Sequence, residues 1–147
     1  LAEKPLTRID FYILSENARS NRLQLACKLT DKAYQAGHRV CLHVASDTDI
    51  ERMNDLLWTF NEQSFIPHDA LKHHSPETPV TITTNLDDTE EHDILINLTD
   101  EVPSCFSQFE RLLEPVDPSE KSRMASRERY RYYRDCGYTI NNHEISV

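Results

Sequence analysis

Glycine is the residue that this chain most clearly lacks, because only two occur among its 147 residues. Gly37 and Gly137 both come directly after stretches with helical periodicity, where glycine commonly ends a helix. A phosphate-binding turn needs several glycines so that the backbone can approach the phosphate. The turn after the first predicted strand, residues 15–19, has none. The sequence therefore argues against a P-loop or a dinucleotide-binding turn, and we expect no nucleotide cofactor.

Long apolar runs and export signals are also missing. No run of about 18 apolar residues occurs, so no segment is predicted to span a membrane. The opening residues LAEKPLTRIDFYIL lack an apolar core followed by a small-residue cleavage site, which makes the cytoplasm the expected location. Four cysteines occur without a Cys-x-x-Cys pair, so we expect reduced thiols rather than disulfides.

Metal-binding spacing is absent as well, although the chain has seven histidines. His73 and His74 are adjacent in a predicted loop, and the odd spacing of His38 and His43 points them to opposite faces of a strand. A zinc site needs three or four convergent ligands, so no metal is predicted. The carboxylates of residues 85–92 (NLDDTEEH) fall in a predicted acidic surface loop, and nothing in the chain indicates catalysis.

The remaining pattern is that of an alternating α/β protein. Strand, helix, strand and helix follow one another, which predicts right-handed crossovers and a mainly parallel sheet in a single domain spanning residues 1–147. Residues 1–7 are expected to be a flexible start. The predicted strands are 8–14, 38–44, 80–84, 93–98 and a last one at 112–116; the predicted helices are 20–36, 46–58, 104–109 and 121–136, with 59–78 irregular.

The last helix has the clearest start and stop signals. Asp117 is predicted to cap the first turn, with Pro118 at the first helical position and Glu120 completing a capping box. Gly137 ends the helix. Residues 121–134 carry a local charge of +5, whereas the net charge of the chain is −9. This asymmetry is the strongest functional indication in the sequence.

Helical spacing gathers part of this charge on one face. Arg129 falls elsewhere and is predicted to form an inward ion pair. The basic face could simply be solvated, or it could bind an anionic partner that also carries an apolar group. It consists of Arg123, Arg127, Tyr130, Arg131 and Arg134.

Aromatic residues gather around the end of the second predicted helix. Trp58 lies in LLWTF and Phe65 in SFIPH. These side chains could belong to the core, or they could form an exposed apolar patch that anchors a partner protein.

Taken together, these motifs resemble the chi subunit family of bacterial DNA polymerase III. The similarity extends over nearly the whole chain and is most specific in the combination of Trp58, SFIPH and RERY. The matching segments are FYIL, AGHRVCLH, LLWTF, SFIPH, DILINL and RERYRYYRDCGY. The resemblance implies a three-layer Rossmann-like domain without nucleotide binding, which serves as a non-catalytic adaptor within a DNA polymerase holoenzyme.

The resemblance also implies two protein partners. One is the psi subunit, which links the adaptor to the clamp loader, and the other is the acidic C-terminal tail of single-stranded DNA-binding protein. The residues that match the psi contact are Trp58 and Phe65, with Ile66, Pro67 and His68 as neighbours. The residues assigned to the tail contact are Val116, Arg123, Arg127, Tyr130, Arg131 and Arg134.

This chain departs from the family pattern at three positions. Arg123 and Arg131 stand where lysine is common, so they can grip a carboxylate with two nitrogens instead of one. Tyr132 stands where a small residue is common. Two alternatives remain open: the basic helix could contact DNA directly, or the domain could be a nucleotide or phosphate-substrate enzyme, which the scarcity of glycine disfavours.

Overall fold

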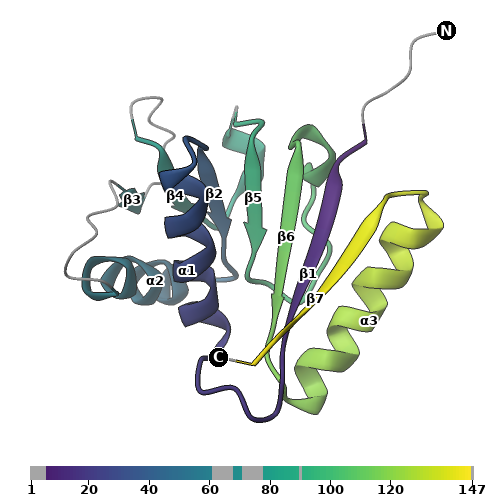
Figure 1. Cartoon of the computed structure of the whole chain (residues 1–147). Helices are drawn as coiled ribbons and strands as arrows, with labels where there is room; N and C mark the ends of the chain where they lie inside the picture. Colours follow the sequence, from purple (N-terminus) through teal and green to yellow (C-terminus); the bar gives the residue numbers. More distant parts are fainter. Residues whose placement is uncertain (1–5, 61–67, 71–77, 90, 147) are drawn as a thin grey trace, which may run out of the picture.

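A seven-stranded sheet forms the centre of the structure, a computed structural model that describes residues 6–60, 68–70, 78–89 and 91–146 (Figure 1). Within these residues the strand order is β3-β4-β2-β5-β6-β1-β7, and every neighbouring pair is parallel. The strands are β1 (Arg8–Leu14), β2 (Val40–His43), β3 (His68–Ala70), β4 (Val80–Thr83), β5 (Ile94–Asn97), β6 (Arg111–Val116) and β7 (Ile140–Ile145).

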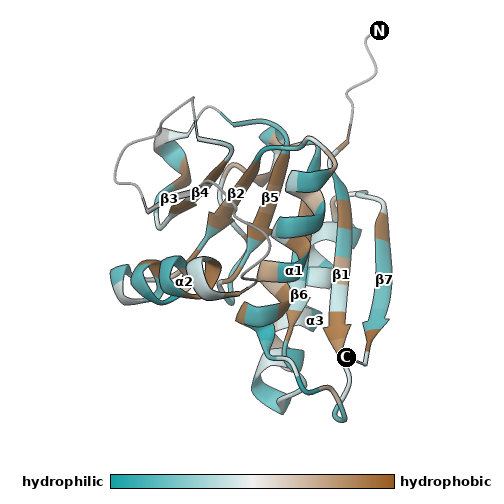
Figure 2. Cartoon of the chain, turned by 60° about the vertical axis from the view of Figure 1, so that its left-hand side comes forward, coloured by the Kyte–Doolittle hydropathy of each residue, from teal (hydrophilic) through white to brown (hydrophobic). Residues whose placement is uncertain are grey.

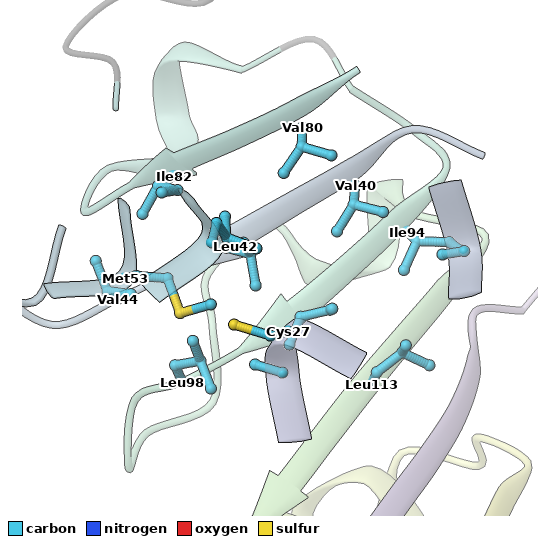
Figure 3. Packing of buried hydrophobic residues seen from close by; sticks show 14 residues of the cluster. Cys27, Val40, Leu42, Val44, Met53, Val80, Ile82, Ile94, Leu98 and Leu113 are labelled. Carbon is cyan, nitrogen blue, oxygen red and sulfur yellow. The ribbon is translucent and has the colours of Figure 1, made fainter. Parts of the chain in front are cut away.

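Helices cover both faces of this sheet. Alternate residues of a strand point to opposite faces, so each face of the buried strands has its own apolar cluster. On one face Leu42 packs with Cys27 and Met53 of the helices, as Figure 3 shows. On the other face Phe11 packs with Tyr133. The helices are α1 (Arg22–Gln35), α2 (Asp47–Thr59) and α3 (Glu120–Asp135), with short 3₁₀ turns η1 (Leu86–Asp88) and η2 (Phe106–Gln108).

The predicted α/β class and three-layer arrangement are therefore confirmed, with α1 and α2 on one face and α3 on the other. Figure 2 shows the apolar strands between helices whose outer faces are hydrophilic. All four cysteines are unpaired, as expected. Each helix of the described residues is too short or too polar to cross a lipid bilayer.

The sequence prediction missed two strands. Residues 59–78 were predicted to be irregular, but His68–Ala70 forms β3 by pairing with β4. The strand at 112–116 was predicted to be the last, but Ile140–Ile145 continues the sheet beyond β1 as β7. Both are edge strands, and β7 is exposed along most of its length, so it lacks the apolar alternation by which buried strands are recognised.

Two helices also start at residues other than those predicted. The first predicted helix, 20–36, begins at Arg22, and Asn21 caps it by forming a capping box with Gln24. Ser119, not Asp117, caps α3 by accepting a hydrogen bond from the Ser122 amide. The predicted capping box at Glu120 is wrong, because this residue is the first of the helix. The predicted stops are confirmed, since Gly37 and Gly137 adopt φ values of +89° and +88°.

Asp117 does not cap α3 as predicted but binds the start of α1. Its Oδ1 accepts a hydrogen bond of 2.7 Å from the backbone N–H of Arg22, at the start of α1. The Arg22 side chain then donates to the Pro115 and Thr99 carbonyls, both at 2.7 Å. These bonds tie the start of α1 to the loops that follow β5 and β6, at the carboxyl ends of the strands.

Two predicted surface segments are partly buried. Most of the expected flexible start, residues 1–5, lies outside the described residues, but Thr7 is buried and its hydroxyl donates to the Phe109 carbonyl at 2.7 Å. Within the acidic loop 85–92, Leu86 is buried against the α3-side core and Glu91 pairs with Arg39 at 2.7 Å. This loop is therefore anchored at both places rather than fully solvated.

Candidate functional site

The inner face of α3 is fixed by a buried polar network. Arg129 Nε lies 3.1 Å from Glu114 Oε1 on β6, which confirms the predicted inward ion pair. The other carboxylate oxygen of Glu114 accepts hydrogen bonds from the Tyr133 hydroxyl at 2.6 Å and from Asn97 Nδ2 at 3.0 Å. Burial, followed by the Glu114 charge, raises the pKa of the Tyr133 phenol, which therefore remains a donor. These contacts fix which face of α3 points outward.

The outward side of α3 carries the predicted basic face. Arg127, Arg131 and Arg134 are each more than half exposed. Arg123 differs, because its side chain is only 29% exposed and its Nε is buried without a hydrogen-bond partner among the described residues. The face therefore combines three solvated guanidiniums with one that is held close to the protein surface.

Each of these arginines has an acidic neighbour. Exposed ion pairs contribute little free energy, because water screens the charges and the long side chains lose freedom. All four acidic partners are themselves well exposed, so the pairs can exchange for another carboxylate at small cost. The pairs are Arg123–Glu16 at 3.9 Å, Arg127–Glu120 at 3.8 Å, Arg131–Glu128 at 2.5 Å and Arg134–Asp135 at 3.1 Å.

The two apolar residues assigned to the same site lie at different depths. Tyr130 is half-buried, with its ring centroid 5.5 Å from that of Phe11, and it packs on the α3-side core. Val116 belongs to that core and is 0% exposed. Val116, which the resemblance assigns to the tail contact, therefore has no exposed surface in this structure, because α3 covers β6 here. Val116 can only support the surface from below.

The second predicted surface lies at the opposite edge of the sheet. Trp58, in the last turn of α2, is 53% exposed. His68 begins β3, the edge strand that α2 contacts. The other predicted members, Phe65, Ile66 and Pro67, lie outside the described residues. In the sheet order, β3 and β4 lie at one end and β6, under α3, lies toward the other, so Trp58 and the basic face belong to separate regions.

One polar cluster was missed by the sequence reasoning. Asp10 on β1 is buried and contacts Arg111 of β6 at 2.8 Å and His143 of β7 at 3.0 Å. The signal was an acidic residue in the middle of an apolar strand, RIDFYIL, which requires a buried partner. Glu114 in RLLEPV carried the same signal.

The part of the chain that the structure describes also bears on metal binding. There, no three or more His, Cys, Asp or Glu side chains are grouped so that they could hold an ion. On the outward side of α3, the exposed guanidiniums of Arg127, Arg131 and Arg134 share the helix with the half-buried ring of Tyr130.

Comparisons of this chain with known proteins all point to one protein family. A family model described as DNA polymerase III chi subunit, HolC, matches residues 6–141. Three similar proteins carry the name DNA polymerase III subunit chi. The protein of Pseudomonas aeruginosa is 36% identical over 140 residues, covering 95% of this chain and 98% of the relative. Those of Haemophilus influenzae and Escherichia coli are 26% and 27% identical, covering 92% and 89% of this chain and 95% and 93% of the relatives.

Proposed function

Because this chain belongs to the DNA polymerase III chi subunit family, and so to the accessory subunits of the replicative polymerase, we propose that it bridges the psi subunit and the acidic C-terminal tail of single-stranded DNA-binding protein. It has no catalytic role in this proposal and requires no cofactor. The bridging places it at the replication fork in the bacterial cytoplasm, connected to the clamp loader through psi.

The observation that carries the proposal is the exposed arginine face of α3. An acidic peptide can replace the weakly held Glu16, Glu120, Glu128 and Asp135 carboxylates without unfolding anything. A terminal carboxylate suits Arg123, whose Nε has no hydrogen-bond partner among the described residues, because charge-assisted hydrogen bonds are stronger than neutral ones. The phenyl group of a terminal phenylalanine would pack on the Tyr130 ring.

An apolar subsite for that phenyl group requires a local rearrangement. Val116 is fully buried, so the ring reaches it only if the Tyr130 side chain moves away from the core. Half-burial of Tyr130 makes such a rotation less costly than moving Tyr133, which is held by Glu114. We therefore expect the Tyr130 ring to change position when the tail binds.

The separate region around Trp58 supports a bridging role. A half-exposed tryptophan at the end of α2 offers the kind of large apolar contact that dominates protein interfaces. It lies toward the β3 edge of the sheet, whereas α3 lies over the strands near the other edge. Two partners could therefore bind at the same time without competing for the same surface.

Fluorescence anisotropy of a labelled acidic peptide ending in Asp-Ile-Pro-Phe tests the tail contact. The peptide is titrated with the protein at low and moderate salt, beside a matched peptide that lacks the terminal phenylalanine. We expect binding that weakens as salt rises and is lost without the phenylalanine. If the protein bound neither peptide, α3 would not be a binding site for the acidic tail.

Direct binding of DNA by the same helix is the second candidate function. The exposed arginines favour it, whereas the net charge of −9 and the single half-buried aromatic ring on the basic face disfavour it. It predicts that the protein alone retains an oligonucleotide, with a steep loss of affinity as salt rises. No retention at low salt would dismiss it.

A further inference from the structure

The face of the sheet opposite α3 is left without a helix over β1 and β7. In Figure 2, α1 lies in front of the sheet toward β5 and β6, while β1 and β7 lie beside it. Between α1 and strands β1 and β6 there is a pocket of about 320 Å³, lined by residues of all three elements. This volume falls at the lower end of the range of small-molecule sites, which begins at roughly 300 Å³.

Three cationic side chains converge on this pocket. Arg8 comes from the start of β1, Arg111 from the start of β6, and Lys32 from the last turn of α1. His38 also lines it, but its ring already contacts Asp93 at 3.1 Å. Three cations around one pocket are unusual in a chain with a net charge of −9, and they suggest that the pocket binds an anion.

Asp10 accounts for part of this charge. Its side chain is 1% exposed, and its carboxylate contacts Arg111 at 2.8 Å, Arg8 at 3.6 Å and His143 at 3.0 Å. One buried carboxylate thus holds two guanidiniums in place, while it is itself hidden from a ligand in the pocket. Arg8 and Arg111 are therefore preorganised, and the pocket presents their positive charge.

Lys32 adds a further positive charge to the pocket. Among the described residues it forms no ion pair, and its side chain is exposed on the α1 side of the pocket. The carbonyl end of α1 carries a partial negative charge, which opposes an anion there. That partial charge is about half an elementary charge, so the full charge of Lys32 outweighs it. With Arg8 and Arg111 against Asp10, the pocket has a net charge of +2.

Aromatic and aliphatic side chains also line the pocket. The Tyr12 ring stacks on His143 with centroids 4.6 Å apart and planes 14° apart, and it also lines the pocket. Leu29 of α1 and Leu113 of β6 complete this lining. These residues suit a ligand that combines an anionic group with a planar ring.

From this combination we propose that the pocket between α1 and strands β1 and β6 binds a nucleoside monophosphate group, either free or at the end of a single DNA strand. Lys32, Arg8 and Arg111 would hold the phosphate, and the base would pack against Tyr12 and Leu113. Side chains supply all of these contacts, so the glycine-rich backbone turn that the sequence lacks is unnecessary. The site also lies at the amino ends of the strands, away from the crevice at their carboxyl ends that usually binds nucleotides.

Isothermal titration calorimetry of the full chain with adenosine 5′-monophosphate, adenosine and inorganic phosphate tests this proposal. We expect the monophosphate to bind more tightly than either of its parts. Lys32→Gln should weaken it about tenfold, as expected for the loss of one charge-assisted hydrogen bond. Lys28→Gln is the matched control, because Lys28 is exposed on the same helix one turn earlier and does not line the pocket.

If both lysine substitutions weakened monophosphate binding equally, the proposed site would be wrong. The effect would then come from the overall positive charge of the surface and not from Lys32 in the pocket. Absence of saturable binding by the monophosphate would overturn it as well. Equally tight binding of inorganic phosphate would overturn the assignment of a base subsite to Tyr12. A 5′-phosphorylated oligothymidylate compared with its 5′-hydroxyl form distinguishes the two sources: preference for the phosphorylated strand over the free nucleotide identifies a strand end.

Discussion

Arg129 Nε and Glu114 Oε1 lie 3.1 Å apart, and both side chains are at most 2% exposed. This pair joins α3 to the middle of β6, and it sets the rotation of the helix about its own axis. With Arg129 inward, helical spacing places Arg123, Arg127 and Arg131 outward. The residues that α3 presents to solvent thus depend on an ion pair that is itself buried.

Breaking this pair should destabilise the protein strongly. Arg129→Met leaves the Glu114 carboxylate buried with only Tyr133 and Asn97 as partners, and such a loss costs about 3 kcal/mol or more. Urea unfolding at neutral pH measures this loss of unfolding free energy. The double variant Arg129→Met/Glu114→Gln removes both charges and should cost less than the sum of the single changes. Simple additivity would contradict direct coupling between the two side chains.

The sequence predicted most of the fold because buried strands and helix ends are encoded locally. The strand at Arg8–Leu14 was predicted with the bounds that the structure has, because it contains a run of apolar residues, of which Ile9, Phe11 and Leu14 are buried. The helix stops at Gly37 and Gly137 were predicted because only glycine adopts such backbone angles without strain. β7 could not be predicted, because an exposed edge strand is defined by its neighbour rather than by its own pattern.

The candidate site was predicted less completely. Helical spacing was enough to separate Arg129 from the outward arginines. Spacing along one helix does not show how deep a side chain lies, so the partial burial of Arg123 could not be predicted. The burial of Val116 depends on the packing of α3 over β6, which the sequence does not show. The Asp10 cluster could not be predicted from the sequence either, because its partners Arg111 and His143 are more than 100 residues away along the chain.

Charge reversal at Arg127 should abolish binding of the acidic tail without unfolding the protein. Arg127 is 59% exposed and its contact with Glu120 is 3.8 Å long, so its substitution by glutamate should change the unfolding free energy by less than about 1 kcal/mol. Anisotropy with the peptide ending in Asp-Ile-Pro-Phe should show a loss of affinity of at least about tenfold. Lys28→Glu, on the opposite side of the sheet, is the matched control and should retain the affinity; an equal loss there would point to net charge alone.

Trp58→Ala should release the psi subunit and leave tail binding unchanged. The indole is 53% exposed at the end of α2, so removing it takes away a large contact area at modest cost to the fold. Co-purification with psi and peptide anisotropy measure the two contacts separately. Met124→Ala provides the control, because Met124 is also an exposed apolar residue but lies on α3. An intact psi complex with Trp58→Ala would remove Trp58 from that interface.

Two of the four thiols should react in the native protein. Cys105 and Cys136 are exposed, whereas Cys27 and Cys41 are buried and their burial raises the pKa of each thiol to about 12. Because the thiolate is the reactive form, the buried pair is protected by both access and protonation. A colorimetric thiol reagent should titrate two groups before denaturation and four after it. Rapid reaction of a third thiol in the native state would show that one of the two apolar layers opens.

The final prediction concerns the pH dependence of the Asp10 cluster. Burial alone would raise the pKa of the Asp10 carboxyl, but hydrogen bonds from His143 and Arg111 outweigh it, and the pKa falls below its ordinary value of 3.8. A lowered folded-state pKa means that the unfolded chain takes up the proton first, so the cluster stabilises the protein fully above 3.8 and progressively less as the pH falls through the lowered pKa.

The difference in unfolding free energy between the wild type and Asp10→Asn isolates this contribution. It should be largest near neutral pH and should shrink as the pH falls below 3.8, because protonated aspartate and asparagine are then both neutral. Asp55→Asn, at an exposed position of α2, should show little difference at any pH. A constant Asp10→Asn difference across the acid range would mean that the carboxylate contributes through its shape and not through its charge. The fixed positions of Arg8 and Arg111 in the α1–β1–β6 pocket would then have to be attributed to packing.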